Sequence, residues 1–134
     1  LAAASGGVPL IVFGKDYKTE DGTCRRDYVH VSDLAAAHIL ALAALEEGKL
    51  STLYNLGNDR SFSVREVIAA VERVTGTRVP HEYGRRRAGD PAILLASSKR
   101  ARLELGWDPV YRELDEIVKS AWQWHRSHPK GYGE

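Results

Sequence analysis

Cysteine and long apolar runs are scarce in this 134-residue sequence. The single cysteine, Cys24, cannot form a disulfide within the chain, which favours a reducing compartment, and we expect a cytoplasmic protein. No segment approaches the roughly 20 apolar residues that a membrane-spanning helix needs, so we expect no membrane partner. The first seven residues lack the basic flank and long apolar stretch of a signal peptide and are typical of the end of an interrupted helix. We therefore expect a fragment of a longer protein.

An excess of charge of one sign is also missing. Lys and Arg number 19 against 18 Asp and Glu, and the net charge is +1. This balance gives no overall attraction to nucleic acid or acidic membranes, so any recognition of charge must be local. His30 and His38 stand apart from other metal-ligating residue types, so we predict no metal site.

Short apolar runs alternate with amphipathic segments along the chain, and this alternation predicts an α/β fold. The expected strands are 9–13, 53–56, 79–83 and 93–96. The expected helices are 32–47, 64–75, 98–105 and 113–128. Ser32 is a good N-cap for the first helix, whose predicted core face comprises Leu34, His38, Ala41, Leu42 and Leu45. Ser63 and Glu66 match a capping box at the start of the second.

Arg25 and Arg26 form the first candidate anion site, at the junction between a turn and a strand. The planar guanidinium group donates two parallel hydrogen bonds to phosphate oxygens and stays charged at any relevant pH. The alternative is a solvated pair that forms a salt bridge with the adjacent Asp27. From spacing alone, the alternative carries slightly more weight.

Three adjacent arginines, Arg85 to Arg87, form the second candidate site between Gly84 and Gly89. Glycines let the backbone approach a bound group closely, and the carboxylate of Asp90 can accept hydrogen bonds from sugar hydroxyls. A nucleoside diphosphate would use both features. A basic surface loop is the alternative, and nucleic acid is a distant third because one triplet lacks a broad basic face with interleaved aromatic residues.

Several longer motifs, taken together, closely resemble UDP-glucose 4-epimerases of the extended short-chain dehydrogenase superfamily. They are Pro9 to Gly14, Asp16-Tyr17, Asp21 to Cys24, Arg26 to Val31, Asp33 to Ala35, Tyr54 to Gly57, Arg87 to Ala92, Leu105 to Trp107 and His128 to Tyr132. Related sugar-nucleotide dehydratases and decarboxylases usually have a shorter turn where this chain has residues 16–23, so the epimerases are favoured.

The resemblance implies that residues 1–134 are the C-terminal, nucleotide-sugar-binding portion of a Rossmann-type fold whose N-terminal dinucleotide-binding domain is missing. Residues 29–57 are then expected to pack with that absent domain and to leave apolar surface uncovered here. The resemblance also implies that the whole protein is a homodimer.

Site residues follow from the same resemblance. The backbone of Ile11, Val12 and Phe13 is expected to contact the uracil ring. Arg26 and Arg87 are expected to bind the diphosphate, and Asp90 the ribose, with Ala88 and Gly89 as part of the site. Arg25 stands where the family commonly has an apolar residue, and the sequence leaves open whether it strengthens phosphate binding or points to solvent.

The resemblance further implies chemistry that this chain does not carry. In the family, bound NAD takes a hydride from C4 of the sugar while a Tyr acts as base, assisted by a Lys and a Ser or Thr. The sequence contains no Gly-x-x-Gly-x-x-Gly turn and no Tyr-x-x-x-Lys, so we expect no catalytic or cofactor-binding residue here and an inactive chain. Two alternatives remain open: another UDP-sugar epimerase, acting on N-acetylated or pentose sugars, and a nucleotide-sugar-binding module without catalysis.

Overall fold

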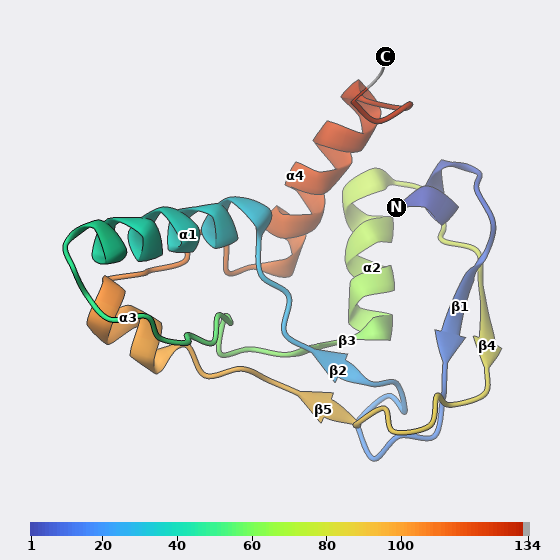
Figure 1. Cartoon of the computed structure of the whole chain (residues 1–134). Helices are drawn as coiled ribbons and strands as arrows, with labels where there is room; N and C mark the ends of the chain where they lie inside the picture. Colours follow the sequence, from blue (N-terminus) through green and yellow to red (C-terminus); the bar gives the residue numbers. More distant parts are fainter. Residues whose placement is uncertain (133–134) are drawn as a thin grey trace.

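Helices and short strands alternate in the computed structural model, which describes residues 1–132 and has an α/β architecture (Figure 1). The helices are the 3-10 helix Ala2–Ser5, α1 (Val31–Glu46), α2 (Val64–Thr75), α3 (Lys99–Leu105) and α4 (Leu114–Ser127). The strands are β1 (Leu10–Phe13), β2 (Arg25–Arg26), β3 (Phe62–Ser63), β4 (His81–Gly84) and β5 (Ile93–Leu94). None of the helices within residues 1–132 is long and apolar enough to cross a membrane.

The strands form two separate small sheets. In the first, β1 and β4 run parallel, with Leu10 opposite His81 and Phe13 opposite Gly84. In the second, β2 lies between antiparallel β3 and parallel β5. The loop after β1 leads into β2 and the loop after β4 leads into β5, so each connection passes from the first sheet to the second (Figure 1).

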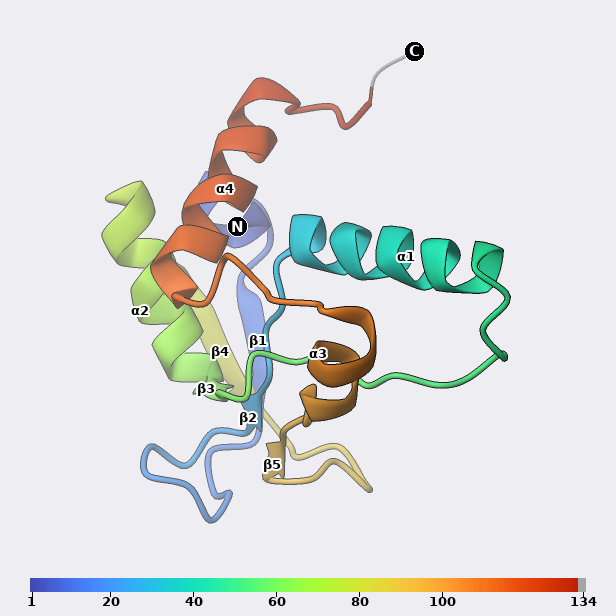
Figure 2. The same cartoon turned by 90° about the vertical axis from the view of Figure 1, so that its left-hand side faces the viewer.

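The main core lies where α2 packs against α4 and the inner face of β1 (Figures 1 and 2). Its buried members are Ala3, Ala4, Val12, Phe62, Ile68, Ala70, Val71, Val79, Leu114 and Val118. The apolar stripe predicted for α2 is confirmed, because Ile68 and Val71 are buried and its other valines pack against them. The predicted capping box is confirmed too: Ser63 accepts from the Glu66 N–H, and the Glu66 carboxylate accepts from the Ser63 N–H.

The smaller core joins α1 to α3 through Trp107, which is 1% exposed. Its indole N–H donates to the carbonyl of Asp33 over 2.8 Å. The Asp33 carboxylate in turn accepts from the backbone N–H groups of Val110 and Tyr111, at 2.9 and 3.0 Å. One buried side chain therefore ties the first turn of α1 to the segment that leads into α4.

The orientation predicted for α1 is wrong. Its buried residues are Asp33, Ala37 and Ala44, while Leu42 and Leu45 are 58% and 51% exposed. The helix is apolar on nearly every side, so its sequence does not single out one face, and the small alanines allow the close approach to α3. The N-cap is His30, whose Nδ1 accepts from the Ser32 N–H over 3.0 Å, so the prediction of Ser32 is also wrong.

The strand predicted at residues 53–56 is not formed. This segment has no regular secondary structure, and Leu53 is 88% exposed, with no strand beside it among residues 1–132. An apolar run becomes a strand only where a neighbour supplies hydrogen bonds. Conversely, β2 and β3 were not predicted, because two-residue strands carry no periodic signal and β2 consists of two arginines.

Candidate functional site

A cavity of about 340 Å³ lies between β1, β2, the first turns of α2 and the arginine-rich loop that follows β4. Its lining residues are Leu10, Ile11, Val12, Phe13, Cys24, Arg26, Tyr28, Val64, Val67, Ile68, Arg87 and Asp90. The fold thus brings together six of the eight predicted site residues, which come from three distant parts of the sequence.

Ala88 and Gly89 do not line this cavity. They form an exposed turn closed by a 3.3 Å hydrogen bond from the Asp90 N–H to the Arg87 carbonyl. Gly89 has a positive φ of 76°, which is the conformation that the third position of such a turn requires and that glycine adopts without strain. The turn places Arg87 and Asp90 on the same side of the loop.

Arg87 lies across the ring of Phe13, with its guanidinium carbon 4.0 Å from the ring centroid. A guanidinium group stacked on an aromatic face keeps its N–H donors available around its edge. The contact fixes the arginine-rich loop against the end of β1. It therefore positions a permanent positive charge beside the cavity.

Arg26 enters the cavity from β2 and forms an ion pair with the Oδ1 atom of Asp90. The second carboxylate oxygen, Oδ2, accepts a 3.1 Å hydrogen bond from the hydroxyl of Tyr17. Both side chains of the ion pair are about three-quarters buried, with 22% and 25% exposed. Two guanidinium groups and one carboxylate therefore line the cavity and leave it with a net positive charge.

Arg25 points away from the cavity. Its guanidinium group donates to the Ser61 hydroxyl at 3.2 Å and to the Ser61 carbonyl at 2.5 Å, and it pairs with Glu66 at 3.1 Å. Adjacent residues in a strand face opposite sides, which separates Arg25 from Arg26. Arg25 therefore neither faces the cavity to bind phosphate nor points freely to solvent. Its charge instead holds β3 and the start of α2 together.

The predicted alternative of an Arg25–Arg26–Asp27 salt bridge is also absent. Asp27 instead accepts hydrogen bonds from the backbone N–H groups of Asn58, at 2.9 Å, and Ala96, at 3.4 Å. Gly57 lies against the same carboxylate, and a Cβ atom there would come within 2.9 Å of Ala96. Asp27 therefore holds the second sheet to the segment that follows α1.

The arginine triplet is divided between two surfaces. Arg86 stacks over the ring of Tyr17, with its guanidinium carbon 4.0 Å from the ring centroid. Arg85 and Arg86 line a separate, more open hollow of about 480 Å³ together with Lys15 and Asp16. Only Arg87 of the triplet lines the cavity beside β1.

The backbone of β1 presents one edge to the cavity. Hydrogen bonds from the N–H groups of Leu10 and Gly14, at 2.9 and 3.0 Å, point toward β4. Because alternate residues of a strand direct their N–H and C=O groups to opposite edges, those of Ile11 and Phe13 point the other way. In the part of the chain that the structure describes, no strand pairs with that edge.

The loop between β1 and β2 is anchored by Asp21. Its carboxylate accepts from the Thr23 N–H and hydroxyl, at 2.8 and 2.7 Å, and from the hydroxyl of Ser63. Burial raises the pKa of the Asp21 carboxyl, but the hydrogen bonds from Ser63 and Thr23 outweigh it, so its pKa lies below the ordinary value. The carboxylate form is therefore the one that the fold stabilises.

Tyr17, Tyr28 and Cys24 also contact the site region, although no role was predicted for them. Tyr17 is 4% exposed and reaches Asp90 from the loop, while Tyr28 and Cys24 line the cavity. Burial raises the pKa of the Tyr28 phenol, and the nearby Cys24 thiol adds to the rise. Tyr17 belongs to the Asp16-Tyr17 motif, which was the only indication of its importance in the sequence. A position in a loop does not show that its hydroxyl contacts Asp90.

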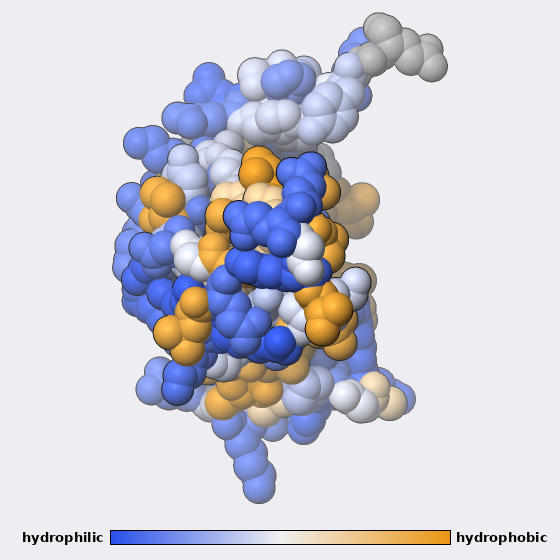
Figure 3. All heavy atoms as spheres, turned by 60° about the vertical axis from the view of Figure 1, so that its left-hand side comes forward, coloured by the Kyte–Doolittle hydropathy of each residue, from blue (hydrophilic) through white to orange (hydrophobic). Residues whose placement is uncertain are grey.

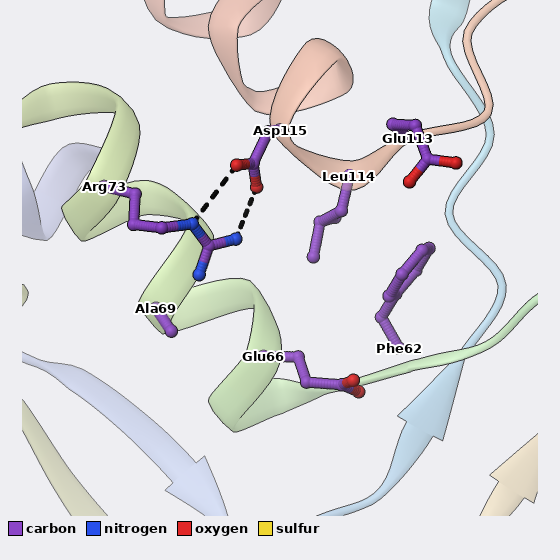
Figure 4. A pocket seen from close by; sticks show the side chains of 7 residues that line it. All are labelled: Phe62, Glu66, Ala69, Arg73, Glu113, Leu114 and Asp115. Atoms are coloured by element: carbon purple, nitrogen blue, oxygen red, sulfur yellow. Dashed lines mark hydrogen bonds and ion pairs between the residues drawn. The ribbon is translucent and has the colours of Figure 1, made fainter.

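A second cavity, of about 500 Å³, separates α2 from the start of α4 (Figure 4). Its charged groups are already paired: Arg73 donates to both oxygens of Asp115, Glu66 pairs with Arg25, and Glu113 pairs with Arg60. Figure 4 shows the Arg73–Asp115 pair bridging the two helices. The charged residues that line this cavity are therefore not free to bind a ligand, and we interpret the cavity as part of the contact between the two helices.

The junction of β3 and α2 does not offer a site for a pyrophosphate. Strand β3 passes directly into α2, and a strand–helix turn can bind pyrophosphate when it is rich in glycine, but this junction is the Ser63–Glu66 capping box. The capping side chains occupy the helix N–H groups that a pyrophosphate would need. Within residues 1–132, no cluster of three His, Cys, Asp or Glu residues has a geometry that could hold a metal ion.

Comparison with known proteins connects this geometry to one group of enzymes. A sequence model of the NAD dependent epimerase/dehydratase family matches residues 1–57. A UDP-glucose 4-epimerase from Lacticaseibacillus casei is 50% identical over 132 residues, which is 98% of this chain and 40% of that protein. The chain therefore spans about two fifths of the length of this relative.

Solved structures agree. A crystal structure of a UDP-glucose 4-epimerase matches 99% of this chain with a TM-score of 0.92 and 50% identity, and the match covers 40% of that chain. The UDP-glucose 4-epimerase of Stenotrophomonas maltophila, solved with NAD and formylated UDP-arabinopyranose, matches 96% of this chain and 38% of its own, with a TM-score of 0.88 and 42% identity. The predicted resemblance and the α/β fold are confirmed.

Proposed function

Since this chain is homologous to UDP-glucose 4-epimerases of the NAD dependent epimerase/dehydratase family, we propose that it is the C-terminal, UDP-sugar-binding part of such an enzyme. The whole enzyme would interconvert UDP-glucose and UDP-galactose with NAD as cofactor. The observation that carries the proposal is the cavity beside β1, where two arginines from distant segments converge with a carboxylate.

The diphosphate is assigned to Arg26 and Arg87. They approach the cavity from β2 and from the arginine-rich loop, so a group between them is held from two directions. Arg26 is partly removed from water, with 22% of its side chain exposed, which strengthens its attraction to phosphate, whereas Arg87 is exposed and is held in place by its stacking on Phe13. Arg25 and Arg86 are not assigned this role because neither lines the cavity: Arg25 is bonded to Ser61 and Glu66, and Arg86 lines the separate hollow.

The uracil ring is assigned to the edge of β1. The backbone N–H and C=O groups of Ile11 and Phe13 face the cavity side of this strand, and uracil carries the complementary N–H donor and carbonyl acceptors along one edge. Recognition through the backbone accounts for a site whose side chains at these positions are apolar. Val12 contributes by fixing the strand, since its side chain is 2% exposed.

Asp90 is assigned to the ribose. Each of its oxygens already accepts one hydrogen bond, from Arg26 or Tyr17, and each retains lone pairs for a sugar hydroxyl. Ala88 and Gly89 would act through the turn that sets the separation between Arg87 and Asp90.

Residues 29–57 are proposed to pack against a dinucleotide-binding domain elsewhere in the enzyme. The outward side of α1 carries four large exposed apolar side chains: Val31, Ile39, Leu42 and Leu45. Leu50 and Leu53, in the segment that follows, are 91% and 88% exposed. Figure 3, in which the end of the molecule carrying α1 and α3 comes forward, shows apolar patches between the polar groups. Surface of this kind marks a contact with another domain or subunit.

Hydride transfer is proposed to occur outside this chain, so that the chain alone is inactive. Binding energy from the nucleotide would orient a sugar whose reacting carbon is served by the other domain. NAD is accordingly placed there, since the junction of β3 and α2 offers no pyrophosphate site. The cytoplasmic location and the homodimer of the whole enzyme are part of the same proposal, as is the sugar pair glucose and galactose.

Calorimetric titration with UDP at several salt concentrations tests the proposal. We expect saturable binding that weakens as salt rises, because phosphate contacts are electrostatic. Arg87→Ala should abolish it, whereas Arg85→Ala, a matched change in the neighbouring hollow, should not. Binding that survives Arg87→Ala would place the diphosphate elsewhere.

Failure of the folded chain to bind UDP leads to a second titration, on a longer polypeptide in which the chain is joined to a dinucleotide-binding domain. Binding there that depends on Arg87 supports the site and shows that it requires the other domain. Binding there that ignores Arg26 and Arg87 contradicts the proposed function. The isolated chain, supplied with NAD and UDP-galactose, should form no UDP-glucose.

A further inference from the structure

The loop from Lys15 to Thr23 reaches the cavity through one buried side chain, Tyr17. Its hydroxyl donates to Oδ2 of Asp90 over 3.1 Å, and its ring carries the guanidinium group of Arg86 at 4.0 Å. Tyr17 is only 4% exposed, because the exposed side chain of Arg86 and the partly buried Asp90 cover it. Tyr17 therefore touches two residues of the arginine-rich loop at once.

The backbone around Tyr17 is adapted to this position. Its N–H donates to the Gly22 carbonyl over 2.9 Å, which closes the loop on itself. Gly14 has a positive φ of 92°, and a Cβ atom there would lie 2.5 Å from the Tyr17 ring and 2.6 Å from Arg86. Both the conformation and the space at Gly14 thus require glycine.

The far end of the loop is fixed independently of the cavity. Asp21 accepts from Thr23 and from the Ser63 hydroxyl, which itself caps α2. The loop is therefore attached at one end to a helix of the main core and at the other to Asp90. The Asp90 carboxylate, on an otherwise exposed loop, is therefore held in place by contacts that lead back to the main core.

We propose that Tyr17 is a positioning residue of the UDP-sugar site, which holds the Asp90 carboxylate so that it serves the ribose and leaves Arg26 available to phosphate. The inference rests on the proposed function. With Oδ2 held by Tyr17, Arg26 contacts the carboxylate through Oδ1 alone. Without the hydroxyl, the carboxylate is free to rotate and accept both N–H groups of Arg26, which is the geometry that arginine prefers. Ribose and phosphate would then each lose a partner.

Tyr17→Phe tests the hydroxyl while retaining the ring under Arg86. Titration of the variant with UDP should show a dissociation constant raised roughly 5- to 20-fold. The loss is smaller than the full contribution of a hydrogen bond to a charged group, because Tyr17 acts on UDP only through Asp90. Tyr132→Phe is the matched control, because Tyr132 is 90% exposed and far from the cavity lining. It should bind UDP as the unmodified protein does.

Two further readouts separate positioning from a merely structural role. The unmodified protein should prefer UDP to 2′,3′-dideoxyuridine diphosphate, and Tyr17→Phe should reduce this preference. In an Asp90→Asn background, adding Tyr17→Phe should weaken UDP binding by less than twofold, since the residue acts through Asp90. Equal losses for both nucleotides, or effects that simply add, would overturn the proposal.

The outcomes distinguish this inference from the function on which it rests. UDP binding that does not depend on Arg26 and Arg87, in this chain or in the longer polypeptide, contradicts the proposed function. Normal UDP binding by both the unmodified protein and Tyr17→Phe contradicts only the role of Tyr17. A Tyr17→Phe protein that fails to fold would assign the hydroxyl to stability and would equally overturn its positioning role.

Discussion

The guanidinium group of Arg87 stacks on the ring of Phe13, at 4.0 Å from its centroid, and this contact joins the arginine-rich loop to the end of β1. Both residues line the cavity to which the nucleotide is assigned. Their contact therefore couples the position proposed for uracil to the position proposed for the diphosphate. The affinity for UDP should accordingly depend on the planar shape of the Arg87 side chain as well as on its charge.

Arg87→Lys keeps the charge but removes the planar group. Lysine cannot form two parallel hydrogen bonds to phosphate and stacks less well on an aromatic ring. We expect the dissociation constant for UDP to rise about tenfold, which corresponds to about 1.4 kcal/mol. Titration calorimetry measures it, and an affinity equal to that of the unmodified protein would show that Arg87 acts only as a point charge.

Arg25 and Arg26 are expected to behave differently despite being adjacent. Arg26→Ala should abolish UDP binding, because it removes a cation from the cavity. Arg25→Ala should leave UDP affinity within about twofold and lower stability instead, since Arg25 holds Ser61 and Glu66. Parallel titrations and urea unfolding curves check both effects. The reverse pattern would exchange the roles of the two residues.

Asp33→Ala should destabilise the protein by about 2–4 kcal/mol, because two backbone N–H groups, of Val110 and Tyr111, lose their acceptor. Asp33 is 3% exposed, so water does not replace the carboxylate readily. Asp108→Ala is the matched control, since its ion pairs are exposed and should contribute less than about 1 kcal/mol. Urea unfolding measures both; equal losses would contradict the tertiary role of Asp33.

The lowered pKa of Asp21 predicts that the stability of the protein depends on pH. Its pKa in the folded protein is lower than the ordinary value of 3.8, so the unfolded chain takes up the proton first as pH falls. The stabilisation is therefore fully present above about pH 4 to 5, and it is lost as pH falls through the folded pKa. Asp21→Asn should be less stable than the unmodified protein at pH 7, and the difference should shrink toward pH 3. A difference independent of pH would contradict this account.

Six of the eight residues that the sequence singled out line one cavity, whereas the strands β2 and β3 and the buried face of α1 were missed. Arg87 and Asp90 could be proposed as ligand contacts because guanidinium and carboxylate groups beside glycines have a direct chemical meaning, and the resemblance selected them from their neighbours. Tyr17 could not, because its importance depends on a partner far along the chain. The same holds for Arg25, whose partners Ser61 and Glu66 become neighbours only when β2 pairs with β3.

Elements with a strong period or a strong terminal signal were predicted correctly. Helix α2 combines an apolar stripe, the Ser63 capping box and Gly76 in the left-handed conformation, so local and tertiary preferences agree. Helix α1 lacks such a stripe, and its buried face was missed because alanines face α3 while leucines remain exposed. The same helix is proposed to contact another domain, which is a physical reason for two apolar faces.

A structure of the protein with UDP bound is the most direct test of the central claim that the cavity beside β1 is the nucleotide site. We predict that the uracil ring pairs with the backbone of Ile11 and Phe13, that the diphosphate lies between Arg26 and Arg87, and that a ribose hydroxyl donates to Asp90. A nucleotide bound elsewhere, for instance in the hollow lined by Lys15 and Arg85, with the cavity left empty, would contradict the account.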